Sequence, residues 1–178
     1  MEDFGFMKGI KGWIKDILIA CTIALLIMAF IKPTIVKESS MQPTLYTNNY
    51  IFLSRQAYLI SPPQAGDIVV FNSDLRTEDG EPKLLIKRVI ALQGDSVTIA
   101  NGNVYINGEL KDEPYILGIE TTGDITNAIV PEGTVFVMGD NRRVSIDSRS
   151  EDVGWVPISD IVGRAFFRLY PFSMMGRI

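Results

Sequence analysis

The chain has 178 residues, of which 21 are acidic and 17 basic, with no histidine and a single cysteine. The missing histidine excludes a Ser-His-Asp triad. Together with the single cysteine it also excludes the common zinc ligand sets, so we expect neither a metal nor a cofactor. A formal charge of -4 provides no broad basic surface, and nucleic acid is therefore not an expected partner.

The first element in chain order is an apolar segment near the N-terminus. Residues 17–31 carry no charged side chain, and counted from Trp13 the segment reaches the roughly 17 to 20 residues that a membrane span needs. A cleaved signal peptide ends in small residues at an A-x-A-like site, whereas this segment continues into Lys32 and Pro33. A buried core helix is the other alternative. We predict an uncleaved transmembrane anchor over residues 13–32, which makes the lipid bilayer a partner.

The lysines on either side of the anchor indicate its orientation. Lys8, Lys11 and Lys15 precede the uncharged run of residues 17–31, and Lys32 and Lys37 follow it. Cytoplasmic flanks carry the excess of basic residues, so this small asymmetry favours a cytoplasmic N-terminus at residues 1–12. Residues 33–178 then form one extracytoplasmic domain that is held at the cell membrane by a single span.

The domain is predicted to be mainly β. Short runs rich in β-branched and aromatic residues are typical of strands, and Asn101-Gly102 between two such runs indicates a hairpin. Residues 112–133 are less patterned, so we expect a peripheral insertion within residues 103–133. The predicted fold is an antiparallel β-sheet or barrel-like catalytic domain with strands at residues 50–54, 67–72, 84–92, 96–100, 104–107, 134–138 and 161–172.

Two residues suggest a catalytic pair. Ser40 follows the apolar segment closely, but a serine hydroxyl is a weak nucleophile until a base takes its proton. Without histidine, a lysine kept neutral by burial is the base that works near neutral pH. Lys87 lies in an apolar run, and strand alternation places it on one face with Leu85 and Val89, where burial should lower its pKa. The alternative is an exposed strand lysine, which is the commoner case.

A polar loop after the strand at 134–138 is the third cluster. We expect Ser145 to hydrogen-bond the Lys87 ammonium, because such a dyad needs a third group that aims the base. Arg88, on the opposite strand face from Lys87, is expected to be a structural ion-pair partner. The alternative is an ordinary polar loop held by carboxylate–guanidinium pairs. The charged residues expected to fix the loop are Asp140, Arg142, Asp147 and Arg149.

Four segments resemble, in order, the motif boxes of bacterial type I signal peptidases. They are residues 40–45 (SMQPTL), 66–71 (GDIVVF), 87–95 (KRVIALQGD) and 139–149 (GDNRRVSIDSR). One box alone is weak, but four in order behind an apolar anchor are specific, and the resemblance covers nearly the whole chain. It implies that Ser40 is the nucleophile, Lys87 the general base and Ser145 the residue that positions Lys87. It also implies that Asp147 and Arg149 form a supporting ion pair.

The resemblance also implies a substrate. This substrate is the signal peptide of an exported preprotein, cut after small residues in an A-x-A pattern through an acyl-enzyme, and the single anchor resembles the Gram-positive form of the family. We expect Ile35, Val36, Leu85 and Ile86 to bind the extended substrate by strand addition. Two other readings remain open: a catalytically inactive accessory relative, and a membrane-tethered β module that only binds a partner.

Glu38 departs from the family pattern. Part of the family has a hydroxyl side chain two residues before the nucleophile, where it helps to stabilise the oxyanion. A carboxylate donates no hydrogen bond and repels a developing negative charge. We therefore expect main-chain N–H groups, including that of Ser40, to bind the oxyanion, and the Glu38 carboxylate to point away from the site.

Overall fold

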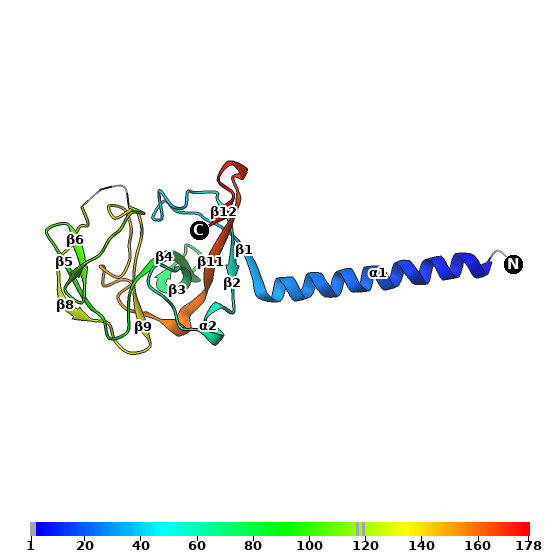
Figure 1. The fold of residues 1–178 in the computed structure, drawn as a ribbon, viewed down its shortest axis with the longest axis horizontal. Helices are drawn as coiled ribbons and strands as arrows, with labels where there is room; N and C mark the ends of the chain where they lie inside the picture. Colours follow the sequence, from blue (N-terminus) through cyan, green and yellow to red (C-terminus); the bar gives the residue numbers. More distant parts are fainter. Residues whose placement is uncertain (1–2, 117, 119) are drawn as a thin grey trace.

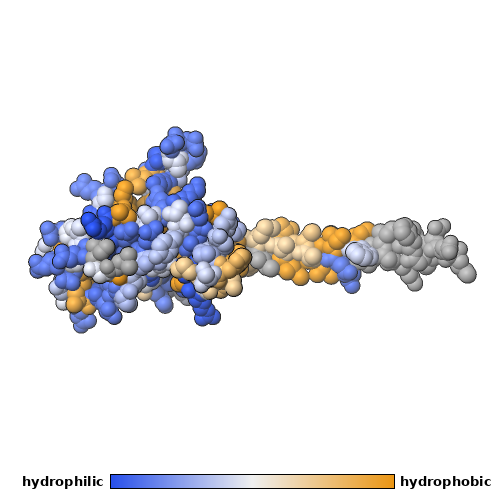
Figure 2. All heavy atoms as spheres, turned by 90° about the horizontal axis from the view of Figure 1, so that it is seen from above, coloured by the Kyte–Doolittle hydropathy of each residue, from blue (hydrophilic) through white to orange (hydrophobic). Residues whose placement is uncertain are grey.

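One long helix projects from a β domain (Figure 1). A computed structural model describes residues 3–116, 118 and 120–178, so residues 1 and 2 of the predicted cytoplasmic segment and residues 117 and 119 of the predicted insertion lie outside it. In helix α1 (Asp3–Phe30), the stretch Trp13–Phe30 is long and apolar enough to cross a membrane, by length and composition. Figure 2 shows this stretch as mostly hydrophobic beside a largely hydrophilic domain face.

Helix α1 ends two residues before the predicted end of the anchor. Ile31 and Lys32 belong to strand β1 (Ile31–Ile35), which follows the helix directly. Pro33 explains this boundary, because proline cannot continue a helix and disfavours helical geometry in the residue before it. Among the described strands β1 pairs only with β2 (Tyr50–Ser54), and an edge strand is where a sheet tolerates proline.

The main sheet is antiparallel, which confirms the predicted fold class. Within the described residues it has eight strands in the order β1-β2-β11-β3-β4-β9-β10, with β12 paired to β11. Short helices α2 (Ala57–Ile60), η1 (Ile158–Asp160) and η2 (Phe172–Met174) lie between strands. The remaining strands of this sheet are β3 (Ile68–Arg76), β4 (Pro82–Leu92), β9 (Thr134–Met138), β10 (Val156–Pro157), β11 (Ile161–Tyr170) and β12 (Gly176–Arg177).

A second, smaller sheet lies at the end of the domain away from α1 (Figure 1). In the described part of the chain its order is β7-β6-β5-β8, formed by β5 (Ser96–Ala100), β6 (Asn103–Ile106), β7 (Glu109–Leu110) and β8 (Ile125–Ile129). Asn101 and Gly102 form the β5–β6 turn with positive φ angles of 51° and 77°, as their sequence favours. Residues 103–133 thus supply three strands, and Val104 and Val130 are buried in the core.

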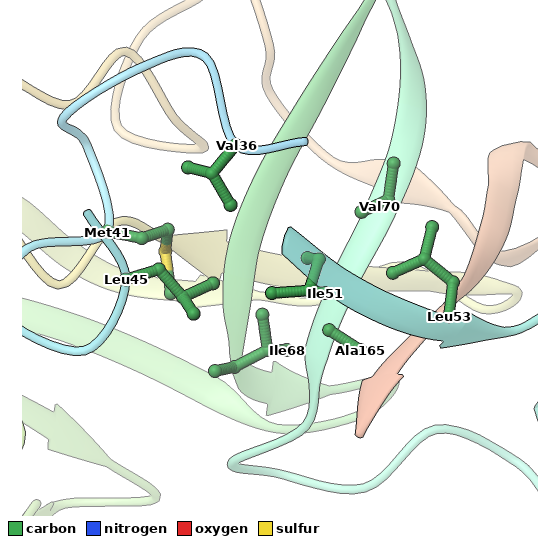
Figure 3. Packing of buried hydrophobic residues seen from close by; sticks show 8 residues of the cluster. All are labelled: Val36, Met41, Leu45, Ile51, Leu53, Ile68, Val70 and Ala165. Carbon is green, nitrogen blue, oxygen red and sulfur yellow. The ribbon is translucent and has the colours of Figure 1, made fainter. Parts of the chain in front are cut away.

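The loop that follows β1 is packed onto a hydrophobic cluster. Figure 3 shows Met41 and Leu45 from this loop beside Ile51 and Ile68 from the sheet. Burying each of these large apolar side chains stabilises the fold by about 1.5–3 kcal/mol. Val36 before Ser40, and Met41 and Leu45 after it, all belong to this cluster. The loop is therefore held on both sides of Ser40. The whole cluster comprises Val36, Met41, Leu45, Ile51, Leu53, Ile68, Val70 and Ala165.

Candidate active site

Ser40 and Lys87 are in direct contact. Ser40 lies in the loop after β1, and Lys87 lies on β4. The Lys87 ammonium donates a hydrogen bond of 2.8 Å to the Ser40 hydroxyl and one of 3.1 Å to the Ile86 carbonyl. Lys87 is 1% exposed and Ser40 is 5% exposed. Leu85 and Val89, on either side of Lys87 in the strand alternation, are buried with it.

Burial changes the acid–base chemistry of this amine. Desolvation disfavours the charged form and lowers the pKa of Lys87 from 10.5 to about 8. The carboxylates of Asp147 and Glu38 raise this pKa, and the cations of Lys83 and Arg149 lower it further. Because the net shift is downward, a useful fraction of the amine is neutral close to physiological pH and able to accept a proton.

The loop that carries Ser40 is tied to the loop at residues 139–149. The Asn141 N–H donates to the Ser40 carbonyl at 2.9 Å, and the Leu45 N–H donates to the Met41 carbonyl at 2.8 Å. Arg149 pairs with the buried carboxylate of Asp147 at 2.9 Å. These contacts fix the serine main chain to a loop that is itself held by an ion pair.

Strand β4 carries a second cation, which holds the same loop. Arg88 projects from the opposite face to Lys87 and donates two hydrogen bonds to Asp140, of 2.8 and 2.7 Å. Its guanidinium lies 4.1 Å from the centre of the Tyr115 ring, a favourable cation–π geometry. Arg88 is therefore the structural ion-pair partner that the sequence predicted, and its partner is Asp140.

Arg142 is held by the segment between β7 and β8. Its guanidinium is buried and donates to both carboxylate oxygens of Glu113, at 2.7 and 2.6 Å, and to the Thr121 hydroxyl at 2.6 Å. Its Nε donates to the Gly139 carbonyl at 3.1 Å. Sequence reasoning did not identify Glu113 or Thr121. A buried arginine requires a carboxylate partner, but no local pattern indicates which of the acidic residues supplies it.

Ser145 does not form the hydrogen bond to Lys87 that we predicted. Its hydroxyl is buried and has no hydrogen-bond partner among the described residues. The Lys87 ammonium has three N–H donors, and its acceptors among the described residues are the Ser40 hydroxyl and the Ile86 carbonyl. The hydroxyl packs against Gly139, where an added Cβ would overlap it and would lie 2.5 Å from the Ser40 carbonyl oxygen. Ser145 is therefore next to the serine main chain, but its predicted contact is not made.

Glu38 forms an ion pair with Lys83 on β4. Its carboxylate thus contacts an ammonium rather than Ser40 or Lys87. The expectation that it points away from the site is nevertheless only partly right, because Glu38 and Lys83 both line the pocket that contains Ser40. Both charges also act on the pKa of Lys87.

An apolar groove of about 710 Å³ lies between β1 and the first half of β4. Both walls are strand edges without a neighbour on the groove side in the described part of the chain: β1 pairs only with β2, and β4 pairs with β9 only from Arg88 onward. The four predicted substrate-binding residues line this groove, namely Ile35, Val36, Leu85 and Ile86.

A buried serine hydroxyl in contact with a lysine amine is the pairing that Ser–Lys hydrolases use in place of a histidine triad. The family model described as signal peptidase, peptidase S26, matches residues 10–170. The chain therefore belongs to this family. Among the described residues no group of three or more acidic or cysteine side chains is placed to hold a metal ion.

Similar proteins cover almost the whole chain. Signal peptidase I S of Bacillus subtilis is 38% identical over 99% of this chain and 97% of its own length. Signal peptidase I of Bacillus licheniformis is 36% identical, covering 90% of this chain and 89% of its own. A crystal structure of a signal peptidase I from Enterococcus faecalis is 32% identical, with a TM-score of 0.47 and coverage of 58% of this chain and 97% of that one.

Gly139 lies where the Ser40 loop meets the 139–149 loop, and the contact leaves no room for a side chain. We expect Gly139→Ala to lower the free energy of unfolding by about 1–3 kcal/mol through overpacking, since its Cβ would overlap the Ser145 hydroxyl and the Ser40 carbonyl. Denaturant unfolding measures the effect, and adding Ser145→Gly should restore part of the loss. Unchanged stability of the single variant would show that the loops are not in contact at this point.

The desolvated amine also lowers stability. The unfolded chain binds the Lys87 proton with a pKa of 10.5 and the folded chain with a pKa of about 8, so the unfolded state holds more protons between these values and stability rises with pH there. Lys87→Met should therefore stabilise the domain at pH 7 by up to about 3 kcal/mol, the free energy that corresponds to the gap. Unfolding at pH 7 and pH 10.5 tests this, with Lys111→Met as control. Equal stability of Lys87→Met and wild type at pH 7 contradicts it.

Proposed function

We propose that the chain is a membrane-anchored serine endopeptidase that removes signal peptides from exported preproteins and cuts after small residues in an A-x-A pattern. The observation that carries this proposal is the 2.8 Å contact between the Lys87 amine and the Ser40 hydroxyl in a buried site. Membership of the signal peptidase family supports it. This contact argues against a catalytically inactive relative, because an inactive protein would not need a buried lysine amine hydrogen-bonded to a serine hydroxyl.

The reaction is acyl transfer with lysine as the base. Neutral Lys87 accepts the proton of the Ser40 hydroxyl as its oxygen attacks the scissile carbonyl carbon. The lysine then returns this proton to the departing amine as the C–N bond breaks, which leaves the signal peptide as an ester on Ser40. Lys87 next deprotonates a water molecule that hydrolyses the ester, and protonates Ser40 to regenerate the starting state.

The oxyanion is bound by main-chain N–H groups. The Ser40 N–H donates to no other described residue, so it is free for a developing oxyanion, and the bond from Asn141 fixes the adjacent carbonyl. Preorganised donors of this kind are among the strongest contributions to acyl-transfer catalysis. Ser145 remains the proposed positioning residue, since its buried hydroxyl has no partner among the described residues and lies beside Gly139, next to the Ser40 main chain.

The substrate lies as an extended strand between β1 and β4. The unpaired edges of the groove supply main-chain hydrogen bonds, and its apolar lining accepts small side chains, which is the usual form of strand addition. The α1 helix ends at Phe30, only ten residues before Ser40, so Ser40 lies within about 35 Å of the end of the anchor. We place the N-terminus in the cytoplasm and the domain outside, following the lysine asymmetry.

Ser40→Ala and Lys87→Ala should each reduce cleavage of a preprotein by the purified full-length protein about a thousandfold or more, as loss of either member of a catalytic pair does. Gel assays of product formation measure this. Ser61→Ala is the matched control, since Ser61 is exposed and lines neither the groove nor the Ser40 pocket, and it should leave turnover unchanged. Normal turnover by either dyad variant would refute the mechanism.

The pH dependence follows from the lowered pKa of Lys87. Only the neutral amine accepts the serine proton, so kcat/KM should rise with pH and level off above about 8, the pKa of Lys87. Initial rates on a peptide substrate between pH 6 and pH 11 measure this limb. A limb at or above the ordinary lysine pKa of about 10.4 would mean that the amine is solvated during the reaction.

A further inference from the structure

The Glu38–Lys83 ion pair joins the two walls of the groove. Glu38 follows β1 and lies two residues before Ser40, while Lys83 lies near the start of β4 and four residues before Lys87. Because strand side chains alternate between faces, Lys83, Leu85 and Lys87 lie on the same face of β4. The pair therefore bridges the gap between the strands at which an extended substrate is proposed to bind.

The pair also lies where two cavities meet. The apolar groove of about 710 Å³ and a pocket of about 390 Å³ that contains Ser40 share Lys37, Glu38, Lys83 and Leu85 in their linings, and of these only Glu38 and Lys83 form an ion pair within the described part of the chain. The Ser40 pocket is further lined by Val144 and Ile146 from the 139–149 loop. A peptide that fills both cavities has to pass the ion pair.

The ion pair is able to open. The Lys83 and Glu38 side chains are 37% and 42% exposed, and ion pairs with this exposure contribute little to stability because water and salt screen them. They differ in this respect from the buried pairs of Asp147, Asp140 and Glu113, which hold the loops in place. Separation of Glu38 from Lys83 therefore leaves the fold intact and exposes one charge on each wall.

We propose that Glu38 and Lys83 determine substrate specificity by charge. The substrate strand separates the two residues, and the substrate side chain at the junction of the cavities replaces one partner of the pair. A basic side chain then binds Glu38, and an acidic one binds Lys83. This inference rests on the proposed function and extends it, because it assigns a charge-reading role to one substrate position.

Strand geometry limits this role to a single position. Side chains that enter the groove and the Ser40 pocket from one face of an extended peptide are two residues apart, or about 6.6 Å. The residue between them projects to the opposite face, so the charge is met by the groove-facing side chain that lies against Glu38 and Lys83 at the junction. Charge at the other positions meets a mainly apolar lining, in which Lys32 and Lys37 form no ion pair with a described residue, so no exchange of partners is offered there.

The test uses purified full-length protein and peptides that place Lys, Gln or Glu at each position in turn before the cleaved bond. At a single substrate position, Lys83→Met should raise the ratio of kcat/KM for the Lys peptide to kcat/KM for the Glu peptide about two- to fivefold, the size expected for an exposed charge contact. Glu38→Gln should lower the same ratio by a similar factor. Both shifts should decrease at high salt.

Lys111→Met and Glu132→Gln are matched controls that remove the same charges at residues lining neither cavity, and neither should change the ratio. A merely structural role for the pair would alter kcat/KM equally for the three side chains, and that result would overturn the inference. Ser40→Ala is assayed in parallel, because cleavage that persists without Ser40 would refute the proposed function instead.

Discussion

The contact between a desolvated amine and a serine hydroxyl is the interaction on which the rest of the structure depends. Lys87 accepts a proton near neutral pH because β4 removes it from water. The same burial is unfavourable for folding, since the charged form is desolvated. An exposed lysine would be easier to accommodate but would stay protonated. Under the proposed mechanism, the domain gives up stability so that a lysine can act where other hydrolases use histidine.

Rigid surroundings make this arrangement possible. Strand β4 presents Lys87 on one face and Arg88 on the other, so one element places the base and anchors the loop opposite it through Asp140. The loop in turn holds the Ser40 carbonyl through Asn141. Buried ion pairs are costly to break on one side only, which keeps the two loops in one arrangement while the more exposed Glu38–Lys83 contact stays adjustable.

The sequence predicted the parts that depend on local pattern. Strands at residues 50–54, 96–100 and 134–138 have the predicted bounds, because alternation and turn residues are local signals. Strand β1 was not predicted, since Pro33 interrupts it and only its place at a sheet edge permits it. The partners of Arg142 and Glu38 also escaped prediction, because a charge pattern does not reveal which distant side chain folds against it.

Lys87 and Ser40 could be paired from the sequence because the missing histidine left few bases and the motif boxes are ordered. The orientation of Ser145 could not, because it depends on a close approach of two loops at Gly139. The pKa of Lys87, measured by NMR titration of ¹³C-labelled lysine side chains with Lys87→Met to assign the resonance, tests the central claim most directly. The account predicts a value near 8, and an ordinary value of about 10.4 would contradict it.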